Sequence, residues 1–168
     1  IRGAGLSWGL AEEGAKAARW LAARAIDPMP ALMDILDRHD HGANISTAIT
    51  LSQAGRWEAR DPMCPIVLGA TLCDRADLLI ASPFVAGPVA RPLLVIPFAA
   101  RAAAMLKHGL RLNLNGDDLL LSEHGELPSG KTPADPVDMD EFRCRIVEGG
   151  TPAQTTRIAN TGMAIDRE

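Results

Sequence analysis

The feature that most restricts the fold of this chain is the stretch LSWGLAEEGAKAARWLAARA, residues 6–25. Its apolar residues recur with the period of an amphipathic α-helix. Ser7 suits the N-cap position, because its hydroxyl can accept a hydrogen bond from an unpaired backbone amide of the first turn. The predicted buried face is small-chained and consists of Leu10, Ala11, Gly14, Ala15, Ala18, Leu21, Ala22 and Ala25. Such a face lets another backbone approach closely, so we expect tight packing on a helix or a sheet.

Trp20 falls on the polar flank of this predicted helix, between Glu13, Lys16 and Arg24. Its ring can lie beneath the aliphatic parts of Lys16 and Arg24, where cation–π contacts form. Alternatively, Trp20 lies in a contact between subunits, since exposed tryptophan is favoured at interface hot spots. The second interpretation predicts self-association.

Further signals predict an alternation of helices and strands. Helices are expected at residues 27–42, 65–80 and 97–108, and strands at 44–52, 56–60, 92–97 and 142–147. Asp-Pro steps at Asp27 and Asp61 mark helix starts. The run PLLVIP, residues 92–97, is continuously apolar between two prolines, which is typical of a strand buried on both faces. The residues before it, 82–91, are rich in Pro and Gly and indicate a loop.

The clearest local signal is Asn115-Gly116 between LRLNL and DDLLLSE, which is typical of a β-hairpin with a type I′ turn. In that register Leu112 faces Leu119, and the leucines form one apolar face. Helices therefore dominate the first half and antiparallel strands the second. We predict the α+β class: amphipathic helices packed on a mainly antiparallel sheet, with a hairpin in the C-terminal half, in a single domain covering residues 1–168.

Composition restricts the partners. The chain has 168 residues, a net charge of −4 and a pI of about 5.6, which argues against general affinity for nucleic acid. No apolar run is long enough to span a membrane, and no signal peptide is apparent. The three cysteines show no CxxC spacing and are expected to be buried in a reducing cytoplasm, as in a bacterial cytosolic protein. The chain begins at Ile1 rather than Met, and we expect further residues upstream.

The densest cluster of metal-ligating residue types is Asp37-Arg38-His39-Asp40-His41. Two histidines separated by one residue can both reach one divalent metal ion from an extended segment, with Asp37 or Asp40 as a third ligand. Asp37, His39 and His41 are therefore the candidate metal ligands. The alternative is a helix end, where His and Arg lie near the last carbonyl groups.

Two arginines, Arg143 and Arg145, project to the same side of the predicted strand at residues 142–147. Either they pair with Asp117 or Asp118 across a sheet, or they hold an anionic ligand. Both interpretations follow from the alternation of side chains along a strand.

Ser7 is a third candidate ligand-binding residue, because Gly-rich backbone before a helix can cradle phosphate. The spacing GxGxxxG departs from the dinucleotide-binding pattern, so a capped turn is the competing interpretation. Cys64 lies at a predicted helix start, where the dipole can lower a thiol pKa. A nucleophilic role needs a nearby base, and the alternative is a buried structural cysteine.

The segment RGAGLSWGLAEEGAKAARWLAAR, residues 2–24, resembles the start of an uncharacterised bacterial family, a domain of unknown function. The later segment PAQTTR, residues 152–157, resembles the same family, whereas residues 160–163 depart from its Gly- and Ala-rich tail. This resemblance implies no activity. The first helix is also similar to the start of the non-Rossmann malate/L-lactate dehydrogenases, over a single element of a chain too short for that enzyme.

These observations favour a non-catalytic small-molecule-binding or assembly domain that acts as a homo-oligomer. The small-residue helix face, Trp20 and the lack of an HExxH motif carry this prediction. The alternative is a small metal-dependent or His-dependent enzyme of carbon catabolism that uses His39 and His41.

Overall fold

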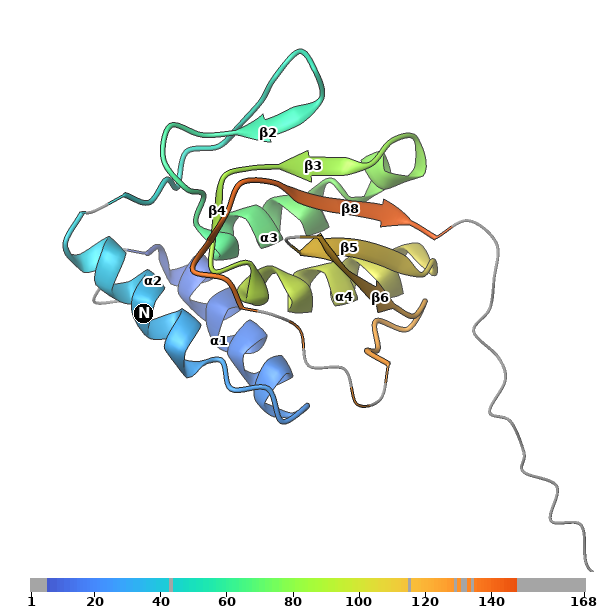
Figure 1. The fold of residues 1–168 in the computed structure, drawn as a ribbon, viewed down its shortest axis with the longest axis horizontal. Helices are drawn as coiled ribbons and strands as arrows, with labels where there is room; N and C mark the ends of the chain where they lie inside the picture. The colour runs from blue at the N-terminus through green and yellow to red at the C-terminus, as the bar shows by residue number, and fades with distance from the viewer. Residues whose placement is uncertain are drawn as a thin grey trace, which may run out of the picture.

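A six-stranded β-sheet accompanied by helices forms the frame of the protein (Figure 1). The computed structural model describes residues 6–147 except 43, 115, 129, 131, 132 and 134. The helices of this part are α1 (Trp8–Ala22), α2 (Met29–Asp40), α3 (Pro65–Asp74) and α4 (Ile96–Leu106), with the 3₁₀ helices η2 (Ala76–Ile80) and η3 (Pro92–Val95). The strands are β1 (Thr50–Leu51), β2 (Arg56–Glu58), β3 (Phe84–Ala86), β4 (Val89–Ala90), β5 (Leu110–Leu114), β6 (Asp117–Leu121), β7 (Asp138–Met139) and β8 (Phe142–Ile146).

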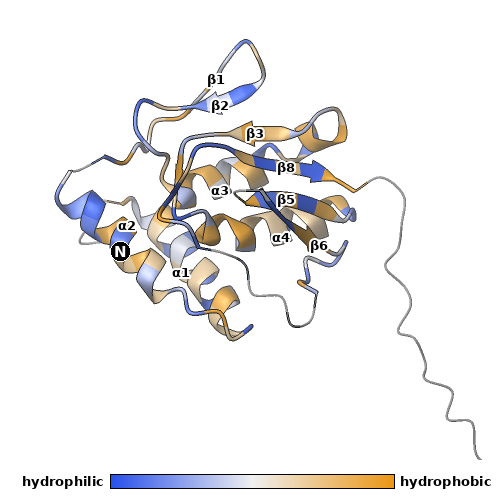
Figure 2. Ribbon diagram, viewed as in Figure 1, coloured by the Kyte–Doolittle hydropathy of each residue, from blue (hydrophilic) through white to orange (hydrophobic). Residues whose placement is uncertain are grey.

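The large sheet has the strand order β1-β2-β3-β8-β5-β6, and its β2–β3 pairing is parallel while its other pairings are antiparallel. Strands β4 and β7 form a separate antiparallel pair. Helices α3 and α4 lie behind the sheet in Figure 2, where α4 is mostly hydrophobic and β8 and β5 carry hydrophilic residues. We call the side of the sheet turned away from α3 and α4 the open face. The predicted α+β class with a mainly antiparallel sheet is confirmed.

Helix α1 follows its predicted N-cap, because the Ser7 hydroxyl accepts a hydrogen bond from the Leu10 amide at 3.5 Å. Its buried residues are Ala11, Gly14, Ala17 and Leu21. The predicted apolar face was too broad, since Ala15 and Ala22 are exposed. Only the side of α1 that contacts α3, α4 and η3 is covered, which leaves the flanking alanines in solvent.

The predicted β-hairpin is confirmed by strands β5 and β6, in which Leu112 pairs with Leu119. Its leucines at positions 110, 112, 114, 119 and 121 are buried, and the residues between them face the other side. Gly116 has a φ of 94°, a conformation that favours glycine, while Asn115 lies outside the described residues. The predicted strand at 142–147 is confirmed as β8, which lies between β3 and β5.

The prediction of a strand at residues 92–97 is wrong. These residues form η3 and the first turn of α4, and Pro97 stands near the helix N-terminus, where its missing N–H is tolerated. Every residue from Pro92 to Ala100 is buried. An element covered on all sides shows no apolar period, so its sequence does not distinguish a buried strand from a buried helix.

The loop predicted at 82–91 instead contains β3 and β4. Strand β3 pairs with β2 on one side and with β8 on the other, and these pairings stabilise it although its three residues show no strong strand pattern. Conversely, the strand predicted at 44–52 is reduced to β1, with a single bridge from Ser46 to Met63.

Helix boundaries also differ in detail. Helix α2 starts after Asp27, whose side chain accepts a hydrogen bond from the Met29 amide at 2.9 Å, as its Asp-Pro signal predicts. The predicted helix at 65–80 divides into α3 and η2. The residue that ends α4 is Lys107, whose backbone is left-handed with a φ of 56°.

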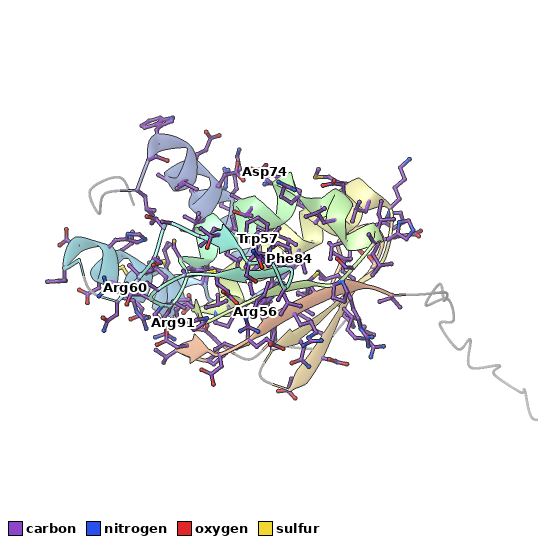
Figure 3. The ribbon with its side chains drawn as sticks, turned by 90° about the horizontal axis from the view of Figure 1, so that it is seen from above. Arg56, Trp57, Arg60, Asp74, Phe84 and Arg91 are labelled. Carbon is purple, nitrogen blue, oxygen red and sulfur yellow. The ribbon has the colours of Figure 1, made fainter. Side chains whose placement is uncertain are left out.

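The core joins the helices to the covered face of the sheet, and it includes buried residues from Leu6 to Cys144. Trp57 and Phe84 lie side by side there, with their rings stacked 5.7 Å apart (Figure 3). Gly69 of α3 lies against α4, where an added Cβ atom would be 2.3 Å from the Phe98 ring. In the described part of the chain, no helix is long and apolar enough to cross a membrane.

Candidate functional site

Two arginines stand opposite each other on the open face of the sheet. Arg111 of β5 and Arg145 of β8 are register partners, and like charges in that position destabilise a sheet. Arg111 is neutralised in part, since its Nη1 lies 3.0 Å from Oδ2 of Asp118. Arg145 makes no hydrogen bond or ion pair with any described residue, and its side chain is exposed. One guanidinium is therefore left available for a ligand.

These arginines line a cavity of about 540 Å³ at the end of the sheet where β3 begins and β8 ends. We call it the Arg145 cavity. Its polar lining residues are Ser82, His108, Arg111 and Arg145. Its other lining residues come from η2, from the following turn and from the last residues of the described chain, Ile146 and Val147. A volume in this range is typical of small-molecule sites.

His108 reaches this cavity from the turn after α4. Its Nδ1 lies 2.7 Å from the Leu106 carbonyl oxygen, which accepts the Nδ1 proton. Nε2 is then the ring nitrogen left for a ligand, as an acceptor in the neutral ring and as a donor in the protonated one.

Electrostatics at this end of the sheet favour negative charge. A hydrogen bond from Asn113 lowers the pKa of the Asp118 carboxyl, and the positive charges of Arg111 and Arg145 lower it further. The same positive charges act on any anion that enters the Arg145 cavity, since one carboxylate, Asp118, stands beside two guanidinium groups.

The predicted ligand-binding residues do not converge on one place. Arg145 lines the cavity, but Arg143 lies beside it on β8 and donates a hydrogen bond to Oε1 of Glu141 at 2.7 Å. Ser7 caps α1 and lines neither this cavity nor the smaller one beside Trp20. Of the two interpretations of the arginine pair, ion pairing describes Arg143, although its partner is neither of the predicted aspartates.

Sequence reasoning missed His108, Arg111 and Ser82 as members of a site. The hairpin pattern placed Arg111 on the polar side of its strand, which was the only signal for it. Its position opposite Arg145 depends on the β5–β8 pairing, which no local pattern encodes.

The predicted metal ligands lie at the end of α2, as the helix-end alternative expects. His41 is the C-cap, and its Nδ1 lies 3.3 Å from Oδ1 of Asp37 and 3.0 Å from the Asp37 carbonyl oxygen. His39 points elsewhere, with Nε2 3.4 Å from Sγ of Cys64. Among the residues that the structure describes, no three His, Cys, Asp or Glu side chains are grouped to hold a metal ion.

The contact between His39 and Cys64 resembles a base beside a thiol, and Cys64 precedes the first turn of α3. However, the Cys64 side chain is fully buried, and this burial raises its pKa despite hydrogen bonds from the amides of Ile66 and Val67. Burial also lowers the pKa of His39. A neutral, buried thiol fits these observations better than a nucleophile does.

Trp20 is half-buried and packs against the core. The Arg24 guanidinium lies 3.7 Å from the centroid of its ring, which agrees with the cation–π interpretation. The smaller cavity beside it, of about 100 Å³, is lined in part by Trp20, Lys16 and Phe98. A role for Trp20 in self-association stays a prediction.

A second group of arginines lies between α2 and the β4–β7 pair, and we call it the α2 ion network. Arg91 binds Oδ2 of Asp34 through Nε at 2.8 Å and Oδ2 of Asp135 through Nη1 at 3.3 Å. Arg38 lies 3.2 Å from Asp34 and 2.8 Å from Asp138. Each guanidinium here has two carboxylate partners, so the network joins α2 to β7 and to the segments that hold Arg91 and Asp135, and it leaves no free cation among its members.

Residues 1–64 match the model of a family described as "Protein of unknown function (DUF3726)". No curated protein and no solved structure matches the chain. The matched residues contain α1, α2, β1 and β2, whereas the residues that line the Arg145 cavity all follow them in the sequence. The predicted resemblance to an uncharacterised family is thus confirmed over residues 1–64, where the chain is similar to DUF3726, a protein family of unknown function.

Proposed function

We propose that this protein binds a small anionic molecule in the Arg145 cavity and does so without catalysing a reaction on it. The observation that carries this proposal is Arg145 itself, which is exposed, faces a second arginine and has no carboxylate partner among the described residues. A bound anion would relieve the repulsion between the two guanidinium groups. It would also receive charge-assisted hydrogen bonds, which are stronger than neutral ones.

The chemistry of the site supports binding more than catalysis. Arginine stays protonated near neutral pH and therefore does not act as a general acid or base. The described residue pair that most resembles a nucleophile and its base, Cys64 and His39, is separate from this cavity and has a buried thiol. The remaining alternative, an enzyme that uses His39 and His41, is tested by metal analysis of the purified protein and of His41→Ala.

The proposal is tested by NMR titration of the full chain with sodium acetate and sodium phosphate at constant ionic strength. We expect saturable shifts in residues around the cavity, and we expect Arg145→Ala to weaken binding by at least about tenfold, the effect of losing one charge-assisted pair. Arg143→Ala is the matched control, because it removes the same charge from the same strand outside the cavity. Equal losses in both variants would show a general charge effect and contradict the proposal.

A further inference from the structure

The Arg145 cavity also has apolar lining residues. Ile80 of η2 is 71% exposed although it is a large hydrophobic residue, and it lines the cavity together with Leu79 and Pro83. On the strand side, Ile146 and Val147 are half-buried and continue this surface. Single exposed hydrophobic residues are common, but here they share one cavity with the arginines. The cavity thus combines polar, partly cationic lining residues with apolar ones, which we call its polar wall and its apolar wall.

The charge on the polar wall matches a single negative charge. Asp118 already neutralises Arg111 in part, which leaves Arg145 as the unpaired cation. A carboxylate fits a guanidinium through two parallel hydrogen bonds. A doubly charged group would leave one charge uncompensated beside Asp118 unless His108 were protonated.

We infer that the ligand of the Arg145 cavity is an amphipathic monocarboxylate, whose carboxylate binds Arg145 and whose hydrocarbon part covers Ile80 and its apolar neighbours. This inference rests on the proposed anion binding and specifies the chemical class of the ligand. The cavity volume of about 540 Å³ exceeds what a carboxylate alone fills and lies within the range of sites that bury a small organic molecule. Burial of each methylene group then adds affinity.

The test is calorimetric titration of the full chain with acetate, butyrate, hexanoate and octanoate, and with octanol as the uncharged analogue. Affinity is expected to rise about twofold to fourfold for each methylene in contact with the apolar wall. Ile80→Ser is expected to reduce this gain, measured as the ratio of octanoate affinity to acetate affinity. Leu120→Ser is the matched control, because Leu120 is another exposed hydrophobic residue that does not line the cavity.

The outcomes separate this inference from the proposed function. If acetate and octanoate bind equally and both lose affinity in Arg145→Ala, the anion site stands and the amphipathic ligand is rejected. If octanol binds as tightly as octanoate, or if no acid binds, both the inference and the anion site are rejected. A chain-length gain that disappears in Ile80→Ser but persists in Leu120→Ser supports the inference.

Discussion

The α2 ion network and the Arg145 cavity use the same side chain in opposite ways. In the network, Arg38 and Arg91 keep only 14% and 16% of their side-chain exposure, and each contacts two carboxylates. At the cavity, Arg145 is exposed and faces Arg111, whose Nη1 lies 3.0 Å from Oδ2 of Asp118. A paired arginine fixes neighbouring elements, whereas an unpaired one is available to a ligand.

The difference comes from how each group is assembled. Asp34 and Arg38 are four residues apart on α2, a spacing that brings opposite charges together on one helix face. The cavity arginines come from adjacent strands whose register is set by their buried partners, such as Leu112 opposite Cys144. Core packing therefore dictates that Arg111 and Arg145 meet, whatever their mutual repulsion costs.

The largest effect on the free energy of unfolding is expected for a variant of the α2 ion network. Arg91→Ala removes the partner of two carboxylates, and Ala would occupy the same left-handed backbone position, so the change isolates the side chain. We expect a loss of about 2 kcal/mol in the free energy of unfolding, less than for a fully buried ion pair because the network is partly hydrated. Urea denaturation measures it. Arg60→Ala, an exposed arginine, serves as the control, and equal losses in the two variants would show that Arg91 is not structural.

The next effect concerns pH, because the two network aspartates respond in opposite directions. Burial raises the pKa of Asp34, but hydrogen bonds from Arg91 and Arg38 outweigh it and lower the pKa overall, so ionised Asp34 adds stability above its ordinary pKa. Burial raises the pKa of Asp135 despite its contact with Arg91. Ionisation of Asp135 is therefore unfavourable in the folded protein, and stability falls as pH rises above the ordinary pKa of aspartate. One of its oxygens, Oδ1, is buried and has no hydrogen-bond partner among the described residues.

Unfolding measured from about pH 3 to pH 7 therefore gives two opposite trends. As pH rises, the free energy of unfolding of wild type should increase relative to that of Asp34→Asn. It should decrease relative to that of Asp135→Asn. Both changes are measured from the differences found at acid pH. Parallel curves for wild type and both variants would show that neither carboxyl has a shifted pKa. Asp34 and Asp135 would then not differ in their effect on stability.

The sequence was sufficient where one local pattern determined the structure. The first helix, its Ser7 cap and the hairpin followed from spacing and turn residues, and residues 92–97 did not because they are buried on all sides. Arg145 followed from alternation along its strand. Its cavity did not, because η2, the start of β5 and the end of β8 meet only through long-range pairing.

The predicted metal cluster shows the converse. Proximity in sequence placed His39 and His41 together on the assumption of an extended segment, but residues two apart on a helix point in different directions. Asp37 and His41, four apart, do meet, and His39 turns inward to Cys64. The helix period, rather than the residue types, decided which of these side chains are neighbours.

A small effect is expected when the unpaired arginine is removed. Arg145→Ala should change the free energy of unfolding by no more than about 0.5 kcal/mol, the usual range for an exposed site, and the sign can be stabilising because a repulsion is lost. Arg143→Ala is the control on the same strand. A loss as large as that of Arg91→Ala would mean that Arg145 supports the fold, and the distinction between the two groups of arginines would fail.

The smallest effect is expected at the contact between His39 and Cys64. We give this contact a structural role because the thiol is buried. Burial raises the thiol pKa, so little thiolate forms near neutral pH. Iodoacetamide should leave Cys64 unlabelled in the folded protein and in His39→Ala alike, as peptide mass mapping would show, while the urea-unfolded chain should be labelled at all three cysteines. Rapid labelling of folded wild type that disappears in His39→Ala would instead identify an activated nucleophile. Catalysis at this pair would then replace ligand binding at Arg145 as the better account of the protein.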